Sequence, residues 1–150
     1  MTILAILEIS STLALGLLVG SLLTEAMILV PYWRKMEPKE FLRLHGTMGP
    51  SLYRYFAPLT IAGTMLPMIT GVISFVAHNF TLNASVVVAL LTSLMFIIYF
   101  IYFKSANKSF ESCSIDIEKI SEELKRWASW HWLRVVIGLI AFSLSIIVSK

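Results

Sequence analysis

The residues best suited to chemistry lie where a charged segment meets an apolar one, in the stretch RWASWHWLR at residues 126–134. If this stretch is helical, Trp127, His131 and Arg134 recur at i, i+4 and i+7 and share one face. Trp132 points nearly the opposite way and is typical of a lipid-interface anchor. An imidazole and a guanidinium that face other helices predict either a buried ion pair or a site for proton and anion chemistry.

A carboxylic acid is predicted at the same depth. Glu25 lies eight residues before Trp33, which places it about 12 Å inward of the interfacial aromatic level. Arg134 lies roughly 10 Å beyond Trp127 along its own helix. We therefore expect a Glu25–Arg134 pair, either direct or through His131.

Three further residues are predicted to join this group. His45 comes from the first charged connection, Tyr53 lies on the inward face of the second apolar segment, and Trp130 flanks the Trp127 line. Together they indicate a pocket with aromatic walls at the end of the molecule that carries the charged connections. The alternative without a ligand is a buried salt bridge flanked by tryptophans that orient the helices.

The same side chains also suggest a metal site. His45, His131 and Glu25 could form a two-histidine, one-carboxylate set, which suits iron or copper and oxygen chemistry. The spacing is non-local, because the sequence has no H-x-x-H or E-x-x-H pair. A haem held by the two histidines is a further alternative, although both are expected near the surface rather than in the core.

Composition indicates which elements must position these residues. The chain has 150 residues, of which 57% are hydrophobic and 14% charged, and a mean hydropathy of +0.81. These values are typical of a membrane protein rather than a soluble domain. Since about 20 apolar residues cross a bilayer as a helix, we predict an all-α, antiparallel four-helix membrane bundle in a single domain over 1–150, with transmembrane helices at 3–32, 51–76, 85–103 and 128–148.

Basic residues predict the orientation of this bundle. They populate the first and third connections, whereas the second, at 78–84, has none. By the positive-inside rule the two basic connections are cytoplasmic, and both termini lie outside, in a periplasmic, extracellular or lumenal space. Membrane lipids are the expected partners of this charge. A net charge of +3 therefore requires no nucleic acid.

Both charged connections are predicted to contain amphipathic helices. The first starts at Pro38 and ends at Gly46, Gly49 and Pro50 after two to three turns. The second, over 115–126, continues without a break into the last transmembrane helix. Inside the membrane, faces of small or hydroxylated residues predict close helix packing; they are Thr60, Gly63, Thr64, Pro67, Thr70, Gly71 and Ser74, then Ser85, Thr92 and Tyr99, and finally Gly138, Ala141 and Ser145.

Two stretches resemble a known family. RWASWHWLRVVIGLIAF is similar to the W-x-x-x-H-x-x-R element that opens the last helix of a family of small four-helix membrane proteins, which includes the fungal anthrone oxygenases. GLLVGSLLTEAMILVP agrees in kind with the family's small-residue first helix. The resemblance implies a membrane oxidoreductase that oxidises a planar polycyclic phenol, such as an anthrone, to a quinone with O2 and without a cofactor.

The resemblance also implies roles for individual residues. The motif match makes His131 the base, Arg134 the partner of the oxyanion and Trp127 part of the wall. Position alone adds Trp130, His45 and Tyr53 as substrate-binding residues, with Glu25 holding His131 or Arg134 in place.

Other functions remain open at this stage. A non-catalytic ligand-binding protein or an accessory membrane subunit would use the same pocket. A small proton-coupled exporter would use Glu25, although the long third connection does not fit that class. The sequence is compatible with a homo-oligomer or with membership of a membrane complex.

Overall fold

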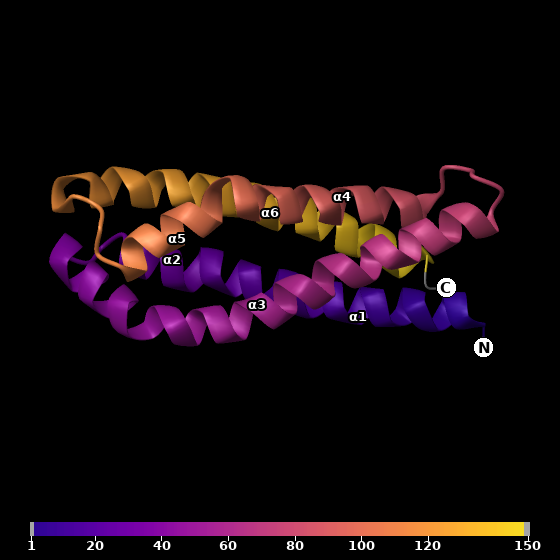
Figure 1. Cartoon of the computed structure of the whole chain (residues 1–150), viewed down its shortest axis with the longest axis horizontal. Helices are drawn as coiled ribbons and strands as arrows, with labels where there is room; N and C mark the ends of the chain where they lie inside the picture. Colours follow the sequence, from indigo (N-terminus) through magenta and orange to yellow (C-terminus); the bar gives the residue numbers. More distant parts are fainter. Residues whose placement is uncertain (1, 149–150) are drawn as a thin grey trace.

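The computed structural model describes residues 2–148, which are helical apart from short connections (Figure 1). Four long helical rods follow one another along the chain. They are α1 (Ile3–Thr24) with the π-helical η1 (Glu25–Leu29) and α2 (Val30–Trp33); α3 (Pro38–Ala77); α4 (Ala84–Ile98) with the π-helical η2 (Tyr99–Phe103) and α5 (Lys104–Glu111); and the 3-10 turn η3 (Ile117–Lys119) with α6 (Ile120–Val148). Each rod runs antiparallel to the one before it, so α1 begins and α6 ends at the same end of the bundle.

All four rods are long and apolar enough to cross a membrane, as the sequence predicts. Each predicted transmembrane segment lies within one rod. With 40 residues, α3 is about 60 Å long, twice the roughly 30 Å of a bilayer's hydrocarbon core. The rods therefore extend beyond the apolar segments at the end that carries the basic connections, which we call the basic end.

The prediction that a separate amphipathic helix ends at Gly46, Gly49 and Pro50 is wrong, because α3 runs unbroken from Pro38 to Ala77. Gly46 and Gly49 lie next to the end of α5 instead. A Cβ on Gly49 would lie 3.2 Å from Cγ of Glu111, at the end of α5. A Cβ on Gly46 would make only ordinary contacts, 3.7 Å from the carbonyl oxygen of Glu111, so the tight approach of the two rods depends on Gly49.

The second amphipathic helix is confirmed. After η3, α6 continues from the charged connection into the apolar segment without interruption. Ile120 and Leu124 are buried, while Glu122 between them is exposed and Glu123 is half-buried.

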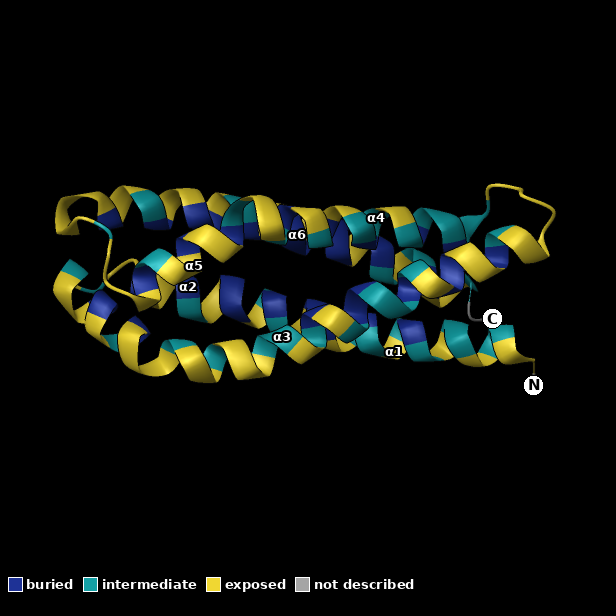
Figure 2. Ribbon diagram, in the orientation of Figure 1, coloured by how far each residue is buried: buried dark blue, intermediate teal, exposed yellow. Residues whose placement is uncertain are grey.

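The buried face of each rod points into the bundle and the exposed face away from it (Figure 2). The core consists of large apolar side chains, among them Leu18, Phe103 and Val135, together with a seam of small and hydroxylated residues. Every residue of the predicted α3 face is buried, as are Gly138, Ala141 and Ser145 of α6. A Cβ on Gly71 would lie 2.4 Å from Cβ of Ala89. The predicted close packing of the helices is therefore confirmed.

Candidate functional site

A cavity of ≈ 570 Å³ lies in the half of the bundle nearest the basic end. All four rods contribute to it: α1 and η1, α3, the α4–η2–α5 rod, and α6. The apolar part of its wall is mostly aromatic, formed by Tyr53, Phe56, Phe96, Tyr99, Phe100, Phe103 and Trp127. The polar lining consists of Glu25, His45, Thr60, Lys104, Asn107, Lys108, Glu111 and Arg134.

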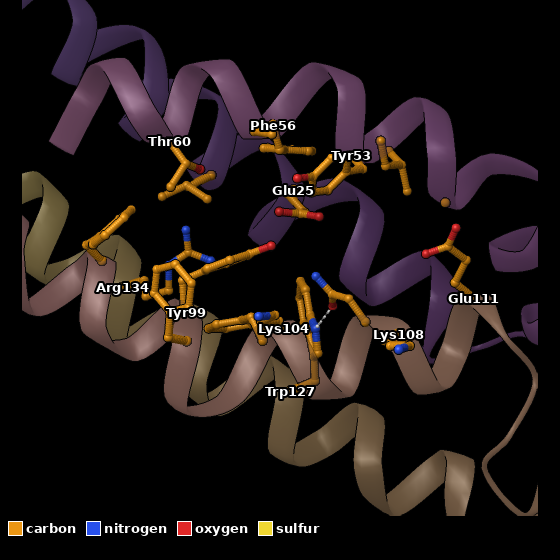
Figure 3. Close-up of a pocket in the computed structure, with 18 of the residues that line it drawn as sticks. Glu25, Tyr53, Phe56, Thr60, Tyr99, Lys104, Lys108, Glu111, Trp127 and Arg134 are labelled. Atoms are coloured by element: carbon orange, nitrogen blue, oxygen red, sulfur yellow. Dashed lines mark hydrogen bonds between the residues drawn. The ribbon is translucent and has the colours of Figure 1, made fainter. Parts of the chain in front are cut away.

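The most unusual lining residue is Arg134, which is only 6% exposed. Its guanidinium carbon lies 4.6 Å from the ring centre of Phe103, and its buried Nε has no hydrogen-bond partner. Figure 3 shows the guanidinium pointing into the cavity near Thr60 and Tyr99. Within residues 2–148 it forms no ion pair. Glu25 interacts with Arg134 only at a longer range than an ion pair. A buried cation with no carboxylate in direct contact favours an anionic group in the cavity.

Glu25 also lines the cavity, but it contacts His131 rather than pairing directly with Arg134. Its Oε2 lies 3.6 Å from Nε2 of His131. The same Nε2 lies 2.9 Å from the carbonyl oxygen of Leu22, to which it can donate only if it carries the ring proton. Of the predicted link from Glu25 through His131 to Arg134, the structure shows the contact between His131 and Glu25. Arg134 instead faces the cavity.

His131 lies behind the wall of the cavity. Its side chain is fully buried, and its ring stacks on that of Trp127 with the centroids 4.8 Å apart and the planes at 16°. Trp127 is the residue that meets the cavity. A ligand in the cavity would thus touch Trp127 and Glu25 before it reached His131.

Two tryptophans separate the predicted histidine ligands. The ring of His45 lies 4.9 Å from that of Trp33, and Trp33 lies 6.0 Å from Trp127, which stacks on His131. In residues 2–148 no three His, Cys, Asp or Glu side chains gather as a metal site would require. The structure therefore does not bring His45, His131 and Glu25 together. Both histidines are buried, whereas they were expected near the surface.

Asn107 holds Trp127 in place and was not predicted from the sequence. The indole Nε1 of Trp127 donates a hydrogen bond of 2.8 Å to Oδ1 of Asn107 (Figure 3). Asn107 lies on α5, beyond residue 103, where the third transmembrane helix was predicted to end. The sequence offered no sign that the helix continues for two more turns.

Of the remaining two predicted site residues, Tyr53 lines the cavity and Trp130 does not. Tyr53 lines the cavity and is 63% exposed, so it lies at the mouth. Trp130 stacks on Tyr102, with centroids 5.5 Å apart and planes at 19°, and does not line the cavity. Three residues after Trp127, it is rotated by about 60° from the Trp127 direction, away from the cavity.

Two π-helical segments flank the cavity. Glu25 is the first residue of η1, and Tyr99, Phe100 and Phe103 belong to η2. A π-helical turn carries an extra residue and shifts the faces of the helix, and such turns are frequent at functional sites. A strict 3.6-residue period could not have predicted which side chains these two segments present.

Comparison with known proteins finds no family model, curated protein or solved structure that matches the chain.

Proposed function

We propose that the cavity binds a planar aromatic molecule with an acidic oxygen and promotes its oxidation by O2, as an anthrone is oxidised to an anthraquinone. One observation carries the proposal: the buried guanidinium of Arg134 faces an aromatic-walled cavity, and no carboxylate of residues 2–148 is in direct contact with it. An enolate or phenolate oxygen would place a negative charge in direct contact with the guanidinium, and the aromatic rings would stack on a flat ligand.

In this proposal two polar groups of the lining, Glu25 and Arg134, carry the chemistry. Glu25 accepts the proton from the acidic ring carbon, and Arg134 stabilises the oxyanion of the resulting carbanion. The carbanion gives electrons to O2, a carbon–oxygen bond forms, and loss of water leaves a carbonyl. In balance, one CH2 group and one O2 become one C=O and one H2O, and no cofactor is required.

In this mechanism His131 is a positioning residue. The resemblance to the anthrone oxygenases makes it the base, but Trp127 covers its ring, and Glu25 is the lining group that can accept a proton. The contact between Nε2 of His131 and Oε2 of Glu25 supports a role in orienting the carboxyl group.

We further propose that the four rods span a membrane with the basic end in the cytoplasm and both termini outside. The apolar length of the rods and the basic residues of the connections at 34–37 and 112–119 and their flanking turns support this orientation.

The reaction can be tested with the protein in phosphatidylcholine nanodiscs and anthrone as substrate, by measuring O2 uptake and anthraquinone formation. We expect Glu25→Gln and Arg134→Gln to lower kcat by about 10²–10³-fold. Glu8→Gln serves as a matched control, because Glu8 lies on the same rod but outside this cavity. A rate no higher than in protein-free nanodiscs would contradict the oxidation.

Two further measurements separate the alternatives. Anthrone binding without turnover would favour the non-catalytic ligand-binding function. Stoichiometric iron or copper in the purified protein, or a Soret band, would favour the metal or haem alternative over the cofactor-free mechanism.

A further inference from the structure

The cavity is elongated along the axis of the bundle. Its lining on α3 extends from His45 to Ile61, sixteen residues apart, which corresponds to about 24 Å. On the facing rod it extends from Phe96 to Glu111. A cavity of this length accommodates a ring system that carries a side chain.

The mouth of the cavity faces sideways. Its exposed lining residues follow one side of the bundle. Tyr53, Ile61 and Phe100 are exposed by 63%, 56% and 51%, and nearer the basic end Lys104, Asn107, Lys108 and Glu111 are exposed as well. Ile61 belongs to α3 and Phe100 to η2, and both lie within the apolar segments of their rods. In a membrane this side of the bundle contacts lipid chains, so the cavity opens between α3 and η2 toward the bilayer.

Two lysines line the cavity nearer the basic end. Lys104 and Lys108 follow Phe100 at i+4 and i+8, on the same side of the rod, and both line the cavity (Figure 3). Nζ of Lys104 lies 5.7 Å from the ring centre of Phe100. In the part of the chain that the structure describes, neither lysine forms an ion pair. Their level, just beyond the apolar segment, is that of lipid headgroups.

From these observations we propose that the ligand is a membrane-dissolved amphiphile with an anionic end. Its ring system enters sideways between α3 and η2 and occupies the aromatic section, while its anionic end rests on Lys104 and Lys108. This inference rests on the proposed binding of an aromatic molecule in the cavity. It adds a second acidic group to the ligand and a path through the lipid.

The charge requirement can be tested with two probes, 4-(1-pyrenyl)butyrate and its uncharged methyl ester. Both are added to the protein in phosphatidylcholine nanodiscs, and affinity is measured from tryptophan fluorescence quenching. We expect the acid to bind about tenfold more tightly than the ester, because two lysines each stabilise the carboxylate. The double variant Lys104→Gln/Lys108→Gln should lose this preference and still bind the ester as the wild type does.

The double variant Lys119→Gln/Lys125→Gln is the matched control, because both lysines are at the basic end but outside the cavity; it should keep the preference. If the ester binds but the acid has no advantage, or if the advantage survives loss of Lys104 and Lys108, the anionic end is disproved while aromatic binding stands. If neither probe binds, the proposed function fails as well.

The path is tested by narrowing the mouth. Ile61→Trp and Phe100→Trp should each slow ester binding by about tenfold, as followed by pyrene anisotropy. Ile69→Trp and Ile101→Trp are controls on the same rods, because both residues are exposed without lining the cavity. Equal binding rates in the mouth and control variants would overturn sideways access.

Discussion

At the scale of single residues, the site depends on side chains that act through their neighbours. Trp127 has the cavity on one side, His131 on another, and Asn107 at its indole nitrogen. Arg134 and Glu25 were predicted from helical periodicity, which gives direction and depth. Their actual partners, Phe103 and His131, depend on rotamers and on the π-helical turns, so periodicity could not identify them.

Replacing Asn107 should destabilise the protein through Trp127. In Asn107→Leu the buried indole N–H loses its acceptor, and we expect the free energy of unfolding to fall by about 1–3 kcal/mol. In a Trp127→Phe background, which has no N–H to strand, the same replacement should cost much less. Denaturant unfolding of the four proteins in a double-mutant cycle gives the coupling, and additive costs would mean that the hydrogen bond is not important.

Two replacements of His131 distinguish the contribution of its ring packing to stability from that of its hydrogen bond. His131→Phe keeps a ring to stack on Trp127 but loses the hydrogen bond to the Leu22 carbonyl, so unfolding should become easier by about 1–2 kcal/mol. His131→Ala also leaves a cavity and should cost about 2–5 kcal/mol. Thermal and denaturant unfolding in detergent measure both, and equal losses would show that ring packing contributes little.

At the scale of the elements, the rods are held together by a seam that the sequence predicts well. Small residues at i, i+3, i+4 and i+7 define one helical face regardless of tertiary contacts, and the structure buries that face of α3 completely. The boundaries were harder to predict, because Gly46 and Gly49 resemble a helix stop. They are instead a contact surface for the end of α5, which only the folded arrangement reveals.

The seam can be tested with two glycines. In Gly71→Ala the new methyl group would meet Cβ of Ala89 at 2.4 Å and the Ser85 carbonyl oxygen at 2.9 Å, so α3 and α4 must separate, at a cost of about 1–3 kcal/mol. A Cβ on Gly20 would meet no atom of a neighbouring element within 4 Å. Gly20→Ala should therefore be neutral or stabilise by up to about 1 kcal/mol. Denaturant unfolding should rank the two in this order, and the reverse ranking would contradict close packing of α3 on α4.

At the scale of the whole molecule, the two basic connections lie at one end, and the 78–83 connection lies with the ends of α1 and α6 at the other (Figure 1). The single cysteine, Cys113, is exposed in one of the basic connections. A membrane-impermeant maleimide should label it only after the cells are permeabilised. A Cys113→Ser/Thr81→Cys variant, with its cysteine at the other end, should be labelled in intact cells. Labelling of Cys113 in intact cells would instead show that the basic end lies outside.

If ligands enter through the sideways mouth at Ile61 and Phe100, binding depends on the ligand's concentration in the membrane rather than in the buffer. A ligand that arrives through lipid is counted per lipid molecule, not per volume of buffer. Adding empty phosphatidylcholine vesicles at constant total substrate should dilute the substrate in two dimensions and slow turnover. The rate of the proposed reaction would then follow how much membrane the cell makes, as well as how much substrate.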